Sequence, residues 1–117
     1  PQIWYLDLFA GENDHEAVKR AGTGGHKEIN RTNLSAEDVE LALKKDIVKK
    51  QLEMIRFRNS FPAFSFDSEI TVKQEGNTLN FVWKKDGYQA LLKAELENKT
   101  FEIKGVDPSG EVKSLID

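Results

Sequence analysis

The sequence TLNFVWKKDGYQALLKAE (residues 78–95) alternates apolar and polar side chains on either side of a central Asp86-Gly87 pair. Alternation of this kind is typical of strands with one buried face. Asp-Gly favours the two-residue type I′ turn of a β-hairpin, which needs a positive φ at both central residues. The stretch therefore predicts two antiparallel strands, at 78–84 and 88–97, joined by this turn.

The alternation continues on both sides of the hairpin. It predicts further strands at 69–74, 100–104 and 111–116, with turn residues such as Gly76-Asn77 and Asp107-Pro108-Ser109-Gly110 between strands. The apolar positions share one face, which comprises Ile70, Val72, Leu79, Phe81, Trp83, Phe101 and Ile103. Residues 63–117 are therefore expected to form a small antiparallel β domain.

The sequence before residue 63 has a different character. Residues 2–9 are a nearly continuous apolar run, which is typical of a parallel strand covered on both faces. A long polar connection with several glycines follows at 10–34, and a short helix is expected at 14–20. Because a lone parallel strand has no partners for its backbone groups, we expect those partners in sequence outside this chain, which also begins at Pro1 rather than Met.

Two helices are expected between the polar connection and the β domain. Ser35 and Asp38 are spaced as in a weak capping box and predict a helix at 36–43. Apolar residues at helical spacing predict a second helix at 46–59, which should pack on a sheet. Pro62 ends it, because proline disfavours helical conformation at the preceding residue and cannot donate a helical hydrogen bond.

Composition excludes several classes of function. The 117 residues carry 17 Lys and Arg against 20 Asp and Glu, so neither nucleic acid nor an anionic membrane is an expected partner. The lack of cysteine excludes a disulfide scaffold, a Cys-rich zinc site and a thiol nucleophile. No apolar run approaches the ~20 residues of a membrane-spanning helix and no signal peptide is recognisable, which makes the cytoplasm the expected compartment.

Four short motifs stand out along the chain: PQIWY at 1–5, LFAGEND at 8–14, EINR at 28–31, and RFRN at 56–59 followed by Ala63-Phe64. Together they resemble the C-terminal part of the sucrose phosphorylase family of the α-amylase superfamily. Those enzymes consist of a (β/α)₈ barrel followed by an antiparallel β domain. The resemblance implies an α+β fragment, in which residues 1–62 supply the last barrel strand, an active-site loop and the last barrel helix, and residues 63–117 form the C-terminal β domain.

The family's reaction defines what the resemblance implies about function. Sucrose phosphorylases transfer glucose from sucrose to phosphate with retention, giving α-glucose 1-phosphate and fructose through a covalent glucosyl-enzyme intermediate. Retention needs two carboxyl groups about 5 to 5.5 Å apart, and in the family both come from earlier barrel strands. The resemblance therefore implies that this chain holds no catalytic residue and is inactive by itself. Sucrose or a related glucoside and inorganic phosphate are the implied partners, with no metal or cofactor.

Four residues of the connection are candidates for substrate binding. Asn30-Arg31 match an Asn-Arg pair of the family, which implies that Arg31 lies at the floor of the glucosyl subsite, where a guanidinium can donate to sugar hydroxyls. The alternative is that Arg31 only pairs with a carboxylate, and Asn30 is more readily interpreted as a brace of the loop. His26 and Lys27 are placed where phosphate or a phosphorylated acceptor could bind, although a solvated loop position is the simpler interpretation.

Departures from the family pattern leave other substrates open. The family usually continues His-Tyr-Tyr after the arginine, whereas this chain has Thr32-Asn33-Leu34, and Gly24-Gly25-His26-Lys27 replaces a Gly-Arg stretch. Relatives in the subfamily act on sucrose 6′-phosphate or glucosylglycerate, and this loop also fits one of them. A non-catalytic β module that binds carbohydrate or a partner is a further alternative. Uncovered apolar surface at 2–9 and 46–59 predicts that the isolated fragment self-associates.

Overall fold

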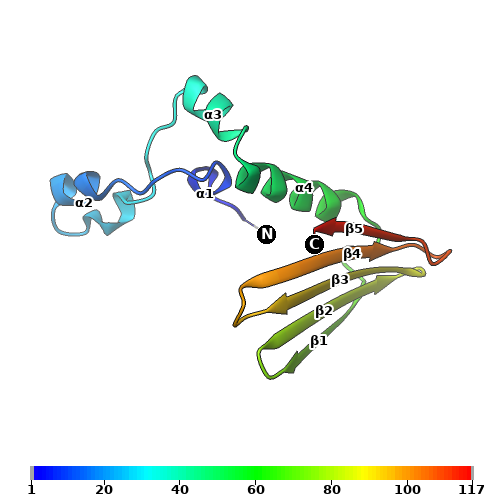
Figure 1. Ribbon diagram of the computed structural model, residues 1–117. Helices are drawn as coiled ribbons and strands as arrows, with labels where there is room; N and C mark the ends of the chain where they lie inside the picture. Colours follow the sequence, from blue (N-terminus) through cyan, green and yellow to red (C-terminus); the bar gives the residue numbers. More distant parts are fainter. Residues whose placement is uncertain (1, 117) are drawn as a thin grey trace. The chain divides into compact units, whose positions relative to one another are not determined.

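The computed structural model describes residues 2–116 and divides into two compact units, Pro1–Leu52 and Glu53–Asp117 (Figure 1). The boundary falls inside the helix α4 (Asp46–Ser60).

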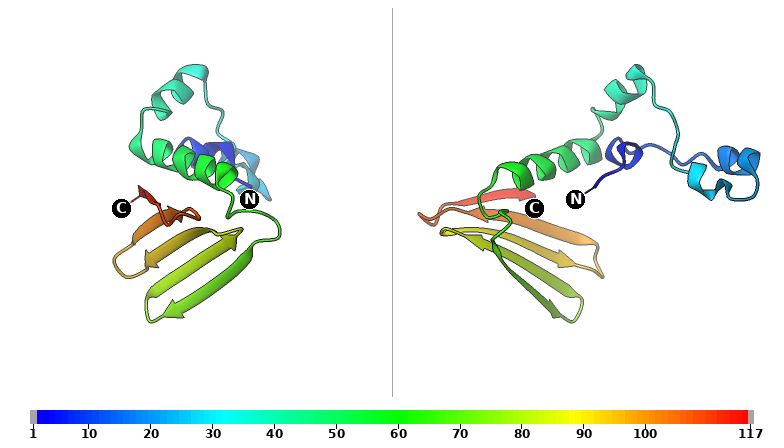
Figure 2. Two further views of the ribbon diagram at one scale, coloured as in Figure 1. Left: turned by 90° about the vertical axis from the view of Figure 1, so that its right-hand side faces the viewer. Right: turned by 180° about the vertical axis from the view of Figure 1, so that it is seen from behind.

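The second unit contains a five-stranded antiparallel sheet. Its strands lie side by side in chain order (Figure 2): β1 (Glu69–Glu75), β2 (Thr78–Lys85), β3 (Tyr88–Glu95), β4 (Thr100–Val106) and β5 (Val112–Ile116). Asp86 and Gly87 have φ values of 49° and 83°, the positive values that a type I′ turn requires, and Lys85 pairs with Tyr88 across this turn. The antiparallel sheet predicted from the alternation is thus confirmed.

Aromatic side chains form the core of this unit at one end of the sheet. Phe57, from the last part of α4, is buried together with Ala63 and Ala90. Its ring centroid lies 4.8 Å from that of Phe61 and 5.4 Å from that of Phe64. The register places Ala90 opposite Gly105, and a Cβ at Gly105 would lie 2.9 to 3.1 Å from the rings of Phe57 and Phe61. Glycine therefore allows the helix to approach the strand.

The first unit is made of short helices. They are α1 (Tyr5–Leu8), α2 (His15–Ala21), the 3₁₀-helix η1 (Gly25–Glu28), α3 (Ala36–Ala42) and the first part of α4. Ser35 and Asp38 form the expected capping box of α3: each side chain accepts a hydrogen bond from the other's backbone N–H, at 3.1 and 2.9 Å. The helices predicted at 14–20, 36–43 and 46–59 are confirmed.

The strand predicted at residues 2–9 is wrong. Tyr5–Leu8 is one turn of α-helix, in which Phe9 N donates to Tyr5 O at 3.0 Å and Gly11 N donates to Leu6 O at 2.9 Å. All strands of the described residues belong to the sheet of the second unit. Backbone groups need partners, and a helical turn supplies them from within the same segment.

Candidate functional site

The candidate residues lie in the first unit, on and just after η1. Gly25, the first residue of η1, is buried, and a Cβ there would lie 2.6 Å from Val18 O and 2.8 Å from the Cβ of Ala21. Glycine thus allows η1 to pack closely on α2. This contact fixes the short helix that carries His26, Lys27 and Glu28.

Hydrogen bonds to earlier parts of the chain hold the segment that follows η1. Asp14 N donates to Ile29 O at 2.8 Å, and Thr32 Oγ1 donates to Glu12 O at 3.0 Å. The Tyr5 hydroxyl donates to Thr32 O. Asn30 and Arg31 therefore lie between two residues whose backbone positions are tied to the start of the chain.

Arg31 forms an ion pair with Glu28. Its Nη1 donates to Glu28 Oε1 at 3.0 Å, and the two side chains are 55% and 40% exposed. A backbone hydrogen bond joins the same two residues, since Arg31 N donates to Glu28 O at 3.2 Å. The pairing with a carboxylate that the sequence left open is therefore present. A guanidinium has five N–H donors in a fixed plane, so the pair is compatible with further bonds to a ligand.

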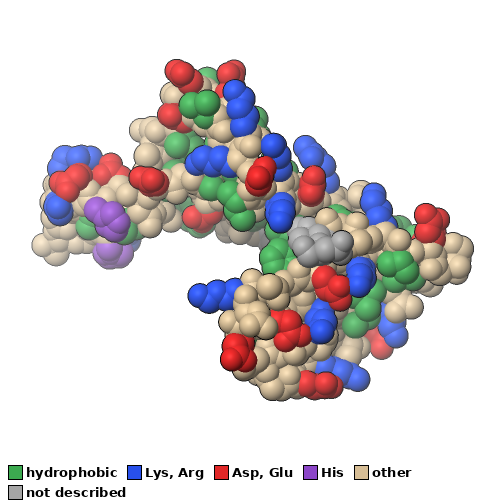
Figure 3. Space-filling view, in the orientation of Figure 1, with side chains coloured by type: hydrophobic (Ala, Val, Ile, Leu, Met, Phe, Trp, Pro, Cys, Tyr) green, Lys and Arg blue, Asp and Glu red, His purple; other side chains and the backbone are tan. Residues whose placement is uncertain are grey.

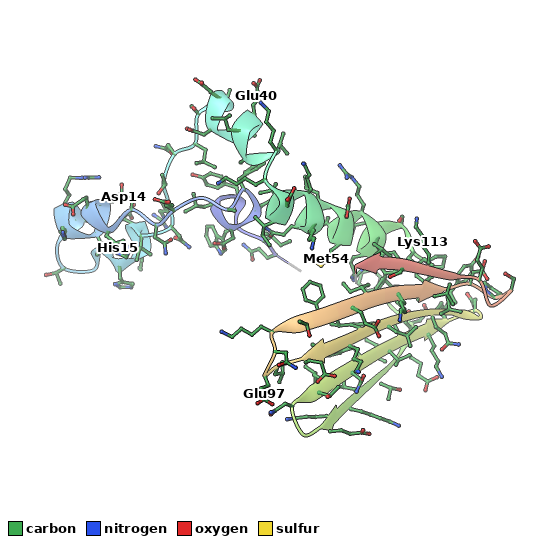
Figure 4. All side chains as sticks on the ribbon, viewed as in Figure 1. Asp14, His15, Glu40, Met54, Glu97 and Lys113 are labelled. Atoms are coloured by element: carbon green, nitrogen blue, oxygen red, sulfur yellow. The ribbon has the colours of Figure 1, made fainter. Side chains whose placement is uncertain are left out.

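The other candidates occupy the same short stretch of chain. His26 and Lys27 are exposed on η1, and Asn30 is half-buried. Figure 3 shows the two histidines of the chain on the same part of the surface, and Figure 4 labels His15 at the start of α2 beside its N-cap, Asp14. The backbone N–H of Ala17 and, less strongly, Arg20 lower the pKa of the Asp14 carboxyl, which keeps the cap ionised.

Glu28, Thr32 and Tyr5 are the residues that sequence reasoning did not assign to the site. Glu28 lies within the EINR motif and three residues before Arg31, a spacing at which two side chains on a helical turn can meet. In the sequence, Thr32 is a departure from the family pattern and gives no sign of its contacts. The contacts of Thr32 and Tyr5 join residues 20 and 27 positions apart, for which the sequence carries no local signal.

The described residues contain neither a cluster suited to a metal ion nor a helix suited to crossing a membrane. Between residues 2 and 116, no group of three or more His, Asp or Glu side chains is arranged to hold a metal ion. The same part of the chain has no helix that is both long and apolar enough to cross a membrane.

The β unit contains an apolar groove. The groove has a volume of about 530 Å³ and is lined mainly by Met54, Leu92, Leu96, Phe101 and Ile103. Figure 4 labels Met54 on α4. Trp83, which a sugar could have used as a stacking platform, is packed against Phe64 and Phe81 with ring centroids 5.2 and 5.5 Å away. These features favour packing over carbohydrate binding.

Comparison with known proteins gives consistent relatives, although no family model matches the sequence. The chain is 55% identical over 103 residues to a sucrose 6(F)-phosphate phosphorylase of Ilumatobacter coccineus, covering 88% of this chain and 20% of the relative. It is 38% identical over 119 residues to the sucrose 6(F)-phosphate phosphorylase of Thermoanaerobacterium thermosaccharolyticum, covering 99% of this chain and 23% of the relative.

A solved structure extends the similarity to the fold. The crystal structure of sucrose 6F-phosphate phosphorylase from Thermoanaerobacter thermosaccharolyticum matches all of this chain and 23% of its own length, with a TM-score of 0.85 and 33% sequence identity. The chain thus spans between a fifth and a quarter of the length of these relatives. It belongs to the sucrose phosphorylase family and corresponds to a C-terminal portion of its members.

Proposed function

We propose that this chain is the C-terminal part of a glycoside phosphorylase that transfers glucose from a sucrose-type substrate to phosphate with retention. The observation that carries the proposal is the 55% identity to a sucrose 6(F)-phosphate phosphorylase over 103 residues. Residues 1–62 then complete the catalytic barrel, and residues 63–117 form its C-terminal β domain. Both catalytic carboxyl groups lie in the preceding portion, so the isolated chain is inactive.

In this proposal Arg31 binds the glucosyl unit. Its backbone is held by the bonds of Ile29 and Thr32 to Asp14 and Glu12, so its side chain starts from a fixed point. A planar guanidinium can donate two parallel hydrogen bonds to neighbouring hydroxyls of a sugar ring. Orientation of the donor sugar by such contacts lowers the entropic cost of reaching the transition state. Asn30 is half-buried beside it and braces the loop.

The substrate that we propose is sucrose 6F-phosphate, which carries its phosphate on the fructosyl unit, and unphosphorylated sucrose is the alternative. The sequence alone favoured unphosphorylated sucrose, but the two relatives described above are both named for the phosphorylated sugar. His26 and Lys27 are exposed on η1, close in sequence to Arg31. An ammonium group is a suitable partner for a phosphate dianion, because a hydrogen bond between opposite charges is about twice as strong as a neutral one.

The cytoplasm is the compartment that fits this substrate. A sugar phosphate carries close to two negative charges at neutral pH and does not cross an apolar bilayer unaided. The enzyme is therefore proposed to work in the compartment where the sugar is phosphorylated.

The test uses a chimera in which residues 1–117 replace the matching C-terminal portion of the Ilumatobacter coccineus enzyme. We expect phosphate-dependent release of α-glucose 1-phosphate from sucrose 6F-phosphate, with a higher kcat/KM than for sucrose. Arg31→Ala should lower the activity on both substrates by roughly two orders of magnitude, the effect of losing charge-assisted bonds in a buried site. Near-normal turnover of this variant would refute the role of Arg31.

Lys27→Gln tests the choice of substrate. It should lower kcat/KM for sucrose 6F-phosphate by about 10- to 100-fold, since a hydrogen bond to a charged group contributes roughly 1.5 to 3 kcal/mol, and leave kcat/KM for sucrose nearly unaffected. Lys50→Gln, which removes the same charge from an exposed position on α4, is the matched control. Equal losses on the two substrates would show that Lys27 does not recognise phosphate.

We also propose that the isolated chain self-associates through apolar surface of its first unit. Ile3, Trp4 and Ile47 are 47%, 50% and 56% exposed. Large exposed apolar patches promote association. Light scattering should give a mass above 13.3 kDa, and Trp4→Ser with Ile47→Ser should reduce it. A monomer at all concentrations would contradict the proposal, and a reduction by Phe101→Ser alone would assign the association to the groove of the β unit.

A further inference from the structure

We infer that Glu28 is a positioning residue of the glucosyl subsite, which fixes the orientation of the Arg31 guanidinium and balances its charge. The inference rests on the proposed function, because it requires Arg31 to contact the transferred sugar. Glu28 is the first residue of the EINR motif. The sequence alone indicates no role for it.

Backbone and side-chain contacts fix the positions of both Glu28 and Arg31. Glu28 ends η1, whose first residue, Gly25, packs against Val18 O and Ala21 where a Cβ would not fit. Arg31 follows within one turn, closed by the 3.2 Å bond from Arg31 N to Glu28 O. The 3.0 Å bond from Arg31 Nη1 to Glu28 Oε1 then fixes the far end of a long side chain. Backbone and side-chain contacts thus join the same two residues.

Nearby charged groups have other partners. Asp14 is paired with Arg20 at 3.4 Å, and Glu16 is paired with Lys19 at 2.6 Å. Glu28 is thus the carboxylate that the structure pairs with Arg31. Lys27 precedes Glu28 in η1 and is exposed. The two basic residues are therefore available for different roles. Arg31 is held beside Glu28, and Lys27 faces solvent.

The chemistry of glucosyl transfer gives the pair its use. The transition state resembles an oxocarbenium ion, so positive charge develops on the sugar ring. A lone guanidinium close to the ring would repel that charge, and in a water-excluded site such repulsion is strong. A paired carboxylate cancels it while the remaining N–H groups of the arginine still donate to sugar hydroxyls. Glu28 therefore lets Arg31 bind the sugar without raising the barrier.

A double-mutant cycle in the chimera tests this role. Glu28→Gln keeps the size of the side chain and removes its charge, and we expect it to lower kcat about tenfold with little change in KM for the sugar donor, a coupling of about 1.4 kcal/mol. In the Arg31→Ala background the same change should have no further effect. Glu16→Gln, which removes a carboxylate from the exposed i,i+3 pair with Lys19, is the matched control and should leave kcat unchanged.

The outcomes separate this inference from the proposed function. Equal losses from Glu28→Gln in the two backgrounds, or no loss at all, would overturn the positioning role while Arg31 kept its own. Normal turnover of Arg31→Ala would instead refute the proposed function. A readout without catalysis uses the 117-residue chain, in which Glu28→Gln should speed rotation about the Arg31 Nε–Cζ bond measured by ¹⁵N NMR. An unchanged rotation rate would overturn the inference whatever the activity of the chimera.

Discussion

Gly105 is the position at which one added methyl group should do the most damage to the β unit. An alanine Cβ there would lie 2.9 Å from Phe61 Cζ and 3.1 Å from Phe57 Cε2 and Cζ, closer than carbon atoms pack. Overpacking of this kind costs about 1 to 3 kcal/mol, because rings must leave their preferred rotamers or the helix must move away from the strand. At about 2 kcal/mol, the melting temperature of a unit of this size should fall by roughly 8 to 16 °C.

Fluorescence of Trp83 provides the assay, since its ring lies 5.2 Å from Phe64 in the same aromatic cluster. Trp4→Phe removes the other tryptophan, so that urea unfolding followed at low protein concentration reports on the β unit. Phe61→Leu is the matched background, because it removes the ring atom nearest to the added methyl. Gly105→Ala should cost less there than in the parent sequence. An unchanged unfolding midpoint, or the same cost in both backgrounds, would refute the packing argument.

Two further changes test the local contacts. Ser35→Ala removes the bond that Asp38 N donates to Ser35 Oγ at the start of α3 and should destabilise the first unit by about 1 kcal/mol, seen as faster amide exchange in α3, whereas unchanged exchange would contradict a role for the cap. Hydrogen bonds from Lys85 and Ser65 lower the pKa of the Asp67 carboxyl from 3.8 to about 2. Its stabilising effect is therefore present above pH 3.8 and is lost as the pH falls toward 2. The stability difference between the parent and Asp67→Asn should shrink over that range, and a constant difference would show that the ion pair does not contribute.

The sheet could be predicted because the sequence features that specify it lie close together along the chain. Each strand pairs with the next one along the chain, and two of the turns between strands have glycine at a position of positive φ, Gly76 at 58° and Gly87 at 83°. Alternation then decides which face each side chain occupies. The helix at 46–59 was predictable for a similar reason, because its period and the proline after it are both written in consecutive residues.

The run at 2–9 shows where local information ends. A short apolar run fits a buried strand or a buried helix, and its partners decide between them. In this chain the carbonyls of Tyr5, Leu6 and Asp7 accept hydrogen bonds from the N–H groups of Phe9, Gly11 and Ala10, close by in the same segment. The contacts of the candidate site could not be predicted from the sequence for a related reason. The bonds that hold Thr32 reach Tyr5 and Glu12 across the whole connection, and the residue types alone do not specify those pairs.

Because the Glu28–Arg31 pair is exposed, we expect it to contribute little to the stability of the chain and much more to turnover. With side chains 40% and 55% exposed, the pair is screened by solvent, and ion pairs in such positions contribute little to folding. In a closed active site the same two charges would interact through a medium of much lower dielectric constant, so their pairing would matter far more. Glu28→Gln should therefore leave the unfolding of the 117-residue chain nearly unchanged and still lower turnover in the chimera. A loss of stability equal to that of a core substitution would show instead that the pair serves the fold.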